Sequence, residues 1–482
     1  MSANGLGDDN RLRLLVAIAS YGEKNAQLLK RVIDQYQAMD LDVDVVVLSN
    51  VPRDLGPRVR VVVGLPSANP WSLPFAHKAV FAENVERYDL FAYSEDDIGV
   101  TEQNIRAFVR ATSQLSPDEI AGFLRYEIAQ SGLLSFPDVH GGYRWNPASA
   151  RRRGDYTVAE FTNEHAAFYL ITRAQLKAMI AHDGFVRAPY LGRYDLPCTA
   201  ATDPYTVYHF RKVICVSALD DFLIHHLSNR YAGQIGISMA CVRDQVQALL
   251  DVALGVRPAS TLFEAETRWT DGQWAKNYYE QPDRDVLKLV PEGTRTVLSI
   301  GCGWGVTEAK LIERGISVTA LPIDSVIAAL AARLGVDVIC GSLDECLSRL
   351  EDRYFDCVLM TDLLHLMPDP KHAVERCSRF VRVGGAFVVG GPNFGSLRVW
   401  AKRAISMGGY EKLKSYQESG INLINPRLFD SFLWPLGFDA SSVRWSAQAE
   451  GSAANTWLSR LNSDRWLARA RRQAATRVPT ST

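Results

Sequence analysis

The chain has 482 residues, 47% of them hydrophobic and 22% charged, and its formal net charge at pH 7 is −1. This length and composition predict two or three globular domains, and the near-zero charge argues against general nucleic-acid binding. No apolar run is long enough to cross a bilayer, and the polar first ten residues lack the apolar core of a signal peptide. We therefore expect a cytoplasmic protein.

The first half of the chain alternates strands and helices. Apolar strands are predicted over residues 12–18 and 43–48, with an amphipathic helix over 25–39 between them. The first strand runs into a small polar turn that contains Ser20, and the second runs into Asn50. This pattern predicts an α/β fold, but it has no glycine-rich loop, so its chemistry must lie elsewhere.

A later apolar strand delivers three consecutive acids, Glu95, Asp96 and Asp97, to its carboxyl end. Adjacent carboxylates repel one another unless a cation or dense hydrogen bonding compensates. Hard oxygen ligands suit Mg²⁺ or Mn²⁺, which usually also coordinate a substrate phosphate. The alternative is an acidic surface turn.

These acids resemble the D-x-D element of nucleotide-sugar glycosyltransferases with the GT-A fold, with Glu95 in place of the first aspartate. The resemblance extends over residues 11–235. It implies that a divalent cation, Mn²⁺ or Mg²⁺, bound by Glu95 and Asp97 bridges the diphosphate of the sugar donor. It also implies a late histidine as metal ligand, either His225 or His226, whereas the alternative is a neutral histidine satisfied in the core.

The same resemblance places Ser20 and Asn50 near the donor nucleotide. His77 and Lys78 lie in a helix expected beside the diphosphate, where they either neutralise phosphate charge or are solvated helix residues. A base is also needed to deprotonate the acceptor hydroxyl. The candidates for this base are Glu164, for which a helix cap or salt bridge is the alternative, and Asp220 and Asp221.

The boundary between the two halves is predicted from a helical pattern over residues 236–254, which Gly255 breaks. We therefore divide the chain into a first domain at 11–235, a helical linker at 236–260, a second domain at 261–450 and a basic tail at 451–482.

The second domain opens with a strand, a glycine loop and a helix. The apolar run 297–300 stops at Gly301-Cys302-Gly303-Trp304-Gly305, and after a helical pattern a second apolar run, 316–321, is followed by Pro322-Ile323-Asp324. This is the β-α-β opening of a doubly wound sheet, in which ligands bind beyond the carboxyl ends of the strands. Glycines at the turn permit close approach of a ligand to the backbone.

The glycine loop resembles motif I of class I S-adenosylmethionine-dependent methyltransferases. Segments at 355–366 and 383–393 also resemble that family, and the similarity spans residues 264–446. It implies S-adenosylmethionine as cofactor, bound at a pocket formed by Gly301, Cys302, Gly303, Trp304 and Gly305. The alternative is a nicotinamide-dependent oxidoreductase, whose dinucleotide fold prefers G-x-G-x-x-G.

The resemblance implies further cofactor contacts by position. Asp324 is the candidate ligand of the ribose hydroxyls, although it lies about two residues later than in the family, and a helix cap is the alternative. Ser342, Leu343 and Asp344 lie where the family contacts adenine, again with a helix cap as the alternative. Tyr278, in an aromatic entry segment, either covers the cofactor or packs in the core.

Three features bear on the methyl acceptor and on membranes. His365 is a candidate base or acceptor ligand, with a core histidine as the alternative. An insertion at 396–425 is basic and aromatic, which suits a sugar-bearing or phosphate-bearing acceptor unless it is a solvated loop. Residues 457–478 predict a basic amphipathic helix that either rests on an anionic membrane or is simply solvated.

These patterns predict a bifunctional enzyme with two α/β domains, a metal-dependent GT-A-like glycosyltransferase followed by a Rossmann-like class I methyltransferase. Its expected partners are a nucleotide-sugar donor and a glycan or glycolipid acceptor, in surface polysaccharide or glycolipid biosynthesis. The alternative is a methyltransferase whose N-terminal half is a non-catalytic glycan-binding module. The sequence predicts neither the donor sugar nor the oligomeric state.

Overall fold

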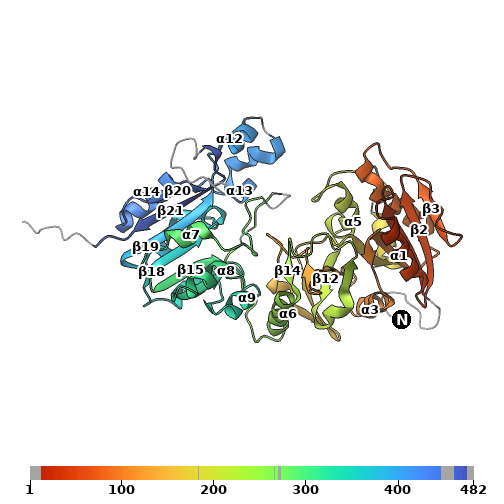
Figure 1. Ribbon diagram of the computed structural model, residues 1–482, viewed down its shortest axis with the longest axis horizontal. Helices are drawn as coiled ribbons and strands as arrows, with labels where there is room; N and C mark the ends of the chain where they lie inside the picture. Colours follow the sequence, from red (N-terminus) through yellow and green to blue (C-terminus); the bar gives the residue numbers. More distant parts are fainter. Residues whose placement is uncertain are drawn as a thin grey trace, which may run out of the picture. The chain divides into compact units, whose positions relative to one another are not determined.

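The computed structural model describes residues 12–182, 184–264, 266–269, 273–405, 407–446 and 461–474. The chain forms two compact units, Met1–Val256 and Arg257–Thr482 (Figure 1). Among the described helices, none is long and apolar enough to span a bilayer.

The main sheet of the first unit is mostly parallel. Its strands, in spatial order, are β11 (Phe168–Thr172), β4 (Leu90–Glu95), β1 (Arg13–Ser20), β2 (Asp42–Ser49) and β3 (Val59–Val63). Only β11 is antiparallel to its neighbour. β1 and β4 are buried almost throughout, as expected of strands covered on both faces. The strand order reverses between β1 and β4, and α/β sheets bind ligands at the carboxyl edge of such a reversal.

Two smaller sheets complete the first unit, with orders β6-β12-β10-β9 and β14-β8-β7-β13-β5. Within the second of these, β13 pairs antiparallel with β5 and sets His226 opposite Ile98. The strands are β5 (Ile98–Gly99), β6 (Glu119–Ala121), β7 (Leu124–Ile128), β8 (Leu134–Phe136), β9 (Arg151–Arg153), β10 (Tyr156–Glu160), β12 (Arg211–Cys215), β13 (Leu223–His226) and β14 (Ile237–Ser238).

The helices of the first unit follow the predicted periodicity. α1 (Ala26–Gln37) buries one face through Leu29, Val32, Ile33 and Tyr36, which confirms the helix predicted over 25–39. The helix predicted in the linker is also confirmed, as α6 (Met239–Ala253). The remaining helices are α2 (His77–Asn84), α3 (Glu102–Thr112), α4 (Arg173–Ala181) and α5 (Leu196–Thr206), with 3₁₀ segments at Pro70–Ala76, Pro147–Ser149 and Val216–Phe222.

The second unit is built on one seven-stranded sheet. In spatial order its strands are β17 (Asp337–Val338), β16 (Ser317–Pro322), β15 (Thr296–Cys302), β18 (Phe355–Thr361), β19 (Val381–Pro392), β21 (Arg465–Arg471) and β20 (Ser442–Ser446). β15 to β19 are parallel, and their order reverses between β15 and β18. β21 is antiparallel to both of its neighbours.

The helices of the second unit connect these strands. They are α7 (Arg284–Leu289), α8 (Val306–Ile312), α9 (Ala328–Arg333), α10 (Leu343–Ser348), α11 (Pro370–Ser378), α12 (Leu397–Ala404), α13 (Tyr416–Ser419) and α14 (Pro426–Leu433). Short 3₁₀ segments occur at Leu364–Leu366, Met407–Lys414 and Trp434–Leu436.

The structure corrects the helix predicted over residues 457–478. Within this segment Arg465–Arg471 forms strand β21, and the predicted positions before 461 and after 474 lie outside the described residues. Trp466 and Leu467 are buried, so they cannot serve as membrane contacts. Pairing with β19 and β20 outweighs the local helical preference of leucine, alanine and arginine.

Candidate functional site

The acidic triplet of the first unit lies at the carboxyl end of β4, beside the end of β1, where the strand order reverses. Ser20 Oγ donates a hydrogen bond to Asp96 at 2.6 Å, and the side-chain amide of Asn25 donates another at 2.8 Å. Asn50 Oδ1 accepts from the Gly22 N–H at 2.7 Å, which orders the turn after β1. Ser20 and Asn50, both predicted near the donor nucleotide, therefore shape this edge of the sheet.

Asp97 pairs with a histidine from β13. His226 Nε2 lies 3.0 Å from Asp97 Oδ2, and His226 Nδ1 lies 2.5 Å from Glu127 Oε1. The register of β13 against β5 brings His226 to this place. Burial alone would raise the pKa of Asp97, but the hydrogen bond and charge of His226 lower it below its usual value.

His225, the histidine predicted first as a metal ligand, faces the other side of β13. Its ring stacks on Tyr126 with centroids 4.8 Å apart, and its Nε2 lies 3.0 Å from Asn229 Oδ1. Neighbouring residues of a strand point to opposite faces. The structure therefore corrects the prediction, because His226 is the histidine at the acids.

A cavity of about 510 Å³ lies at these acids. Glu95 and Asp96 contribute to its lining, and Tyr21 and Trp71, which are 52% and 68% exposed, line it as well. Burial raises the pKa of Glu95 to about 7, although the charge of Arg125 opposes this rise. The cavity therefore combines aromatic side chains with carboxylates whose ionised form a nearby cation would stabilise.

His77 and Lys78, predicted to neutralise phosphate charge, are both buried. His77 lies 2.6 Å from the hydroxyl of Tyr169 and 2.6 Å from the carbonyl oxygen of Pro74, and burial lowers its pKa to about 3. Lys78 forms a buried ion pair with Asp203. The structure therefore contradicts the predicted phosphate contacts, since both side chains are used inside the fold.

Two of the three predicted acceptor bases, Glu164 and Asp221, bind neighbouring side chains. Glu164 accepts hydrogen bonds from the hydroxyl of Tyr194 and, at 2.8 Å, from Arg193, which favours the salt-bridge alternative. Asp221 accepts from an amide side chain of α3 at 3.1 Å, and Asp220 is exposed in the same 3₁₀ segment. Within the described residues, the contacts of these side chains do not include a bond to the acidic triplet.

In the second unit, the predicted glycine loop joins β15 to α8. Gly301 and Gly305 have φ values of 73° and 86°, which favour glycine. A Cβ at Gly303 would collide with the carbonyl oxygen of Tyr278, and the Trp304 N–H donates to that oxygen at 2.9 Å. Leu363, Tyr278 and Ala331 pack against its three glycines, and the cofactor contact that the resemblance implies at this loop stays a prediction.

Asp324 binds the backbone of the turn that follows β16. Its Oδ1 accepts from the N–H groups of Val326 at 2.8 Å and Ile327 at 2.7 Å, and the residue is 3% exposed. These are the contacts of a residue that caps a turn. The structure therefore favours the capping alternative over the predicted ribose contact.

Ser342 and Asp344 also make local contacts. Ser342 is the N-cap of α10, and its Oγ accepts from the Glu345 N–H at 3.3 Å. Leu343 begins the helix. Asp344 forms an ion pair with Arg376, and its side chain is 76% exposed. For this segment too, the structure favours the helix-cap alternative over the predicted adenine contact.

A network of charged side chains surrounds the carboxyl end of β18, and sequence reasoning missed it. Lys276 Nζ lies 3.0 Å from Glu280 Oε2, and Arg465 forms ion pairs with Asp283 and, at 2.7 Å, with Asp362. Asp362 follows β18 directly and has a φ of 56°. Its place after an apolar strand was the one available signal, because Arg465 comes from a strand that was predicted as a helix.

A cavity of about 650 Å³ lies beside this network. Asp362 and Arg465 line it, and the insertion predicted on the acceptor side contributes Arg398 and Tyr410. The Tyr410 ring packs edge-on against Trp274 with centroids 5.5 Å apart. The cavity therefore offers both charged and aromatic groups to a bound molecule.

His365, the predicted base, does not line this cavity. It is buried, its Nε2 lies 2.9 Å from the carbonyl oxygen of Trp274, and burial lowers its pKa to about 4. A neutral histidine bound to a backbone carbonyl is a packing element, so the structure favours the core alternative.

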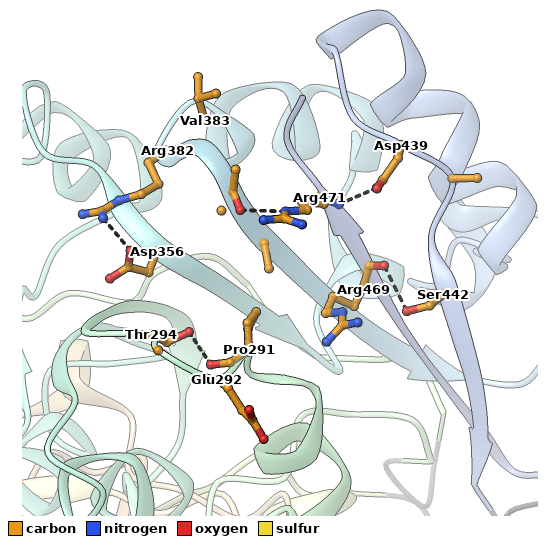
Figure 2. Close-up of a pocket in the computed structure, with 15 residues that line it drawn as sticks. Pro291, Glu292, Thr294, Asp356, Arg382, Val383, Asp439, Ser442, Arg469 and Arg471 are labelled. Carbon is orange, nitrogen blue, oxygen red and sulfur yellow. Dashed lines mark hydrogen bonds and ion pairs between the residues drawn. The ribbon is translucent and has the colours of Figure 1, made fainter. Parts of the chain in front are cut away.

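Another cavity of about 650 Å³ lies at the opposite edge of the same sheet, at the amino ends of β18 and β19 (Figure 2). Arg382 pairs with Asp356 at 2.6 Å, and Arg471 Nε donates to the Gly384 carbonyl oxygen at 3.0 Å. Sheets of this type bind ligands at their carboxyl ends, not at this edge. We therefore place the functional site of the second unit at the cavity that Asp362 and Arg465 line.

The fold and site of the second unit are those of a doubly wound α/β domain with a glycine loop at its carboxyl edge. Residues 281–412 match a family model described as methionine biosynthesis protein MetW.

Individual relatives carry methyltransferase names. Over 97 residues, 19% of this chain, the protein is 31% identical to a ubiquinone biosynthesis O-methyltransferase of Nitrosomonas europaea, and over 116 residues, 24% of this chain, it is 32% identical to an uncharacterized methyltransferase of Mycobacterium bovis. The chain spans less than half the length of these curated relatives, 41% and 46%. A solved S-adenosylmethionine-dependent methyltransferase from Archaeoglobus fulgidus is 19% identical, with 39% of this chain and 90% of that chain covered and a TM-score of 0.30.

Proposed function

We propose that the chain is a bifunctional transferase. The second unit would transfer a methyl group from S-adenosylmethionine, and the first would transfer a sugar from a nucleotide-diphosphate donor to a glycan or glycolipid. One observation carries the proposal for both units: a parallel sheet reverses its strand order, and a cavity with polar lining lies at its carboxyl edge.

Methyl transfer is supported by the family match over residues 281–412 and by the connection between the glycine loop and the cavity. Glu280 lines the cavity, and its carbonyl oxygen accepts from Trp304 Nε1 of the glycine loop at 2.5 Å. Bound S-adenosylmethionine would supply an electrophilic methyl group, and the protein would mainly align the acceptor with it. In this arrangement Asp362 and Arg465 orient charged groups of the bound molecules. The name of the O-methyltransferase relative favours an oxygen acceptor.

Sugar transfer is supported by Asp97 and His226. Their side chains lie 3.0 Å apart, so one divalent cation could take both as ligands by displacing the proton of the hydrogen bond between them. Within the described residues no group of three or more His, Cys, Asp or Glu is arranged to hold a metal, so the donor diphosphate and water would have to complete the coordination. A cation held in this way would neutralise charge on the departing nucleotide.

Fusion of the two units suggests that they serve one pathway, with the second unit methylating the sugar that the first adds, or its neighbour. This hypothesis rests on the fusion alone. Assays of the whole protein with glycan and non-glycan acceptors test it, and methylation of non-glycan acceptors alone would contradict it.

Ligand-induced stabilisation tests both activities. S-adenosylhomocysteine at about 100 times its Kd should stabilise the native protein by about 2.7 kcal/mol, which raises the melting temperature of a unit of this size by roughly 5–10 °C. A nucleotide sugar with Mn²⁺ should stabilise the protein in the same way. Stabilisation by a nicotinamide dinucleotide, without any by S-adenosylhomocysteine, would overturn the methyl-transfer proposal in favour of an oxidoreductase.

A further inference from the structure

Helix α12 of the second unit turns apolar side chains toward solvent. Leu397 is 54% exposed and Trp400 is 65% exposed, and Ile405 at the end of the helix is 69% exposed. Val399 is buried. Figure 1 shows α12 at the margin of its unit. A surface helix normally directs its apolar side toward the core, so this orientation calls for a partner.

The exposed apolar residues form one continuous face. At 3.6 residues per turn, the exposed residues Trp400, Ala404, Leu397, Ala401 and Ile405 fall within an arc of about 140°. Val399 lies on the opposite side of the helix. Basic side chains border the arc on both sides, with Arg398 and Lys402 on one and Arg403 on the other.

Charge indicates what this face binds. Residues 397–414 contain the bases Arg398, Lys402, Arg403, Lys412 and Lys414 but only one acid, Glu411. An apolar arc with a basic border, and a tryptophan within it, matches the interface of an anionic lipid layer. An interface with another protein would favour acids facing some of these bases. We propose that α12 docks on an anionic membrane surface and buries Leu397, Trp400 and Ile405 in it.

This contact would replace the one predicted for residues 457–478. The apolar residues Trp466 and Leu467 of that segment are buried within the sheet, whereas those of α12 are exposed. Membrane docking is therefore assigned to a helix that the sequence singled out only as part of a basic, aromatic insertion.

The position of α12 also links the membrane to the cavity of the second unit. Arg398 and Val399 of α12 line the cavity, together with Ser396 just before the helix. A helix that rests on lipid with one side and lines the cavity with another would bring the cavity close to lipid head groups. The methyl acceptor would then be the head group of a membrane lipid. This step rests on the proposed methyl transfer, whereas the docking itself does not.

Vesicle sedimentation of the whole protein tests the docking. The protein should bind vesicles of phosphatidylglycerol mixed with phosphatidylcholine, and it should bind pure phosphatidylcholine weakly. Trp400→Ala should weaken binding about tenfold, and added salt should weaken it further. Trp434→Ala is the matched control, because Trp434 is 74% exposed but lies outside α12. This control variant should bind as the wild type does.

The contrary outcomes are distinct. If wild-type protein fails to bind the anionic vesicles, or if Trp400→Ala binds as well as Trp434→Ala does, the proposal fails. Analytical ultracentrifugation provides a further test, since a dimer that Trp400→Ala converts to monomer would make the face a self-association surface. Calorimetry with S-adenosylhomocysteine, done without lipid, checks that each variant is folded. Wild-type protein that ignores this ligand yet binds vesicles would remove the methyl-transfer proposal and leave the docking in place.

Discussion

Asp97→Asn is expected to lower nucleotide-sugar turnover at least about 100-fold, while methyl transfer stays unchanged. Asparagine keeps the size of the side chain but removes its charge. A cation bound between this position and His226 would therefore lose its anionic protein ligand. The substitution also removes the carboxylate that helps to raise the pKa of His226. Both activities should be measured on one preparation, with donor turnover followed at several Mn²⁺ concentrations.

Two controls sharpen this experiment. Asp42→Asn removes an exposed acid at the opposite edge of the same sheet and should leave turnover unchanged. His226→Ala should reduce turnover as Asp97→Asn does, whereas His225→Ala should not, because its ring faces Tyr126. Full turnover by Asp97→Asn would remove the sugar-transfer proposal. Wild-type protein that binds glycans but turns over no donor would instead favour the binding-module alternative.

The sequence located both carboxyl edges because the signal there is local. An apolar run that ends in acids, as at Glu95, or in glycines, as at Gly301, marks the end of a strand whatever its neighbours are. Parallel strands then gather these ends at one edge of a sheet. For this reason Ser20 and Asp96 meet in the structure, although 76 positions separate them.

The choice between His225 and His226 was beyond the sequence for the opposite reason. Both residues sit on one strand, and a shift of one residue in register exchanges the faces that they occupy. Only the pairing of β13 with β5 decides which of them reaches Asp97. The phosphate contacts predicted for His77 and Lys78 were wrong for a similar reason, because their partners Tyr169 and Asp203 lie far along the chain.

Strand β21 shows a third kind of limit. Its sequence, RWLARAR, favours a helix by local preference, and only β19 and β20 make it a strand. Because this strand was predicted as a helix, the sequence did not indicate that Arg465 forms an ion pair with Asp362. The network therefore depends on the part of the sheet that local patterns describe least well.

Arg465→Met is expected to destabilise the second unit by about 2–3 kcal/mol. The guanidinium pairs with Asp283 and Asp362, and its removal would leave two partly buried carboxylates without their cation. The side chain is 23% exposed, so solvent recovers part of the cost of a fully buried pair. Chemical denaturation followed by circular dichroism measures the change.

Arg444→Met is the matched control for this substitution. Arg444 is exposed on the adjacent strand β20, so its loss should change stability by less than about 0.5 kcal/mol. A double-mutant cycle isolates the ion pair, because Asp362→Asn removes one of the carboxylates that Arg465 compensates. In that background Arg465→Met should cost distinctly less than in the wild type. Equal costs in the two backgrounds would mean that the ion pair with Asp362 does not contribute to stability, and Asp362 would then lose the fixed cation that our account of the methyl-transfer cavity gives it.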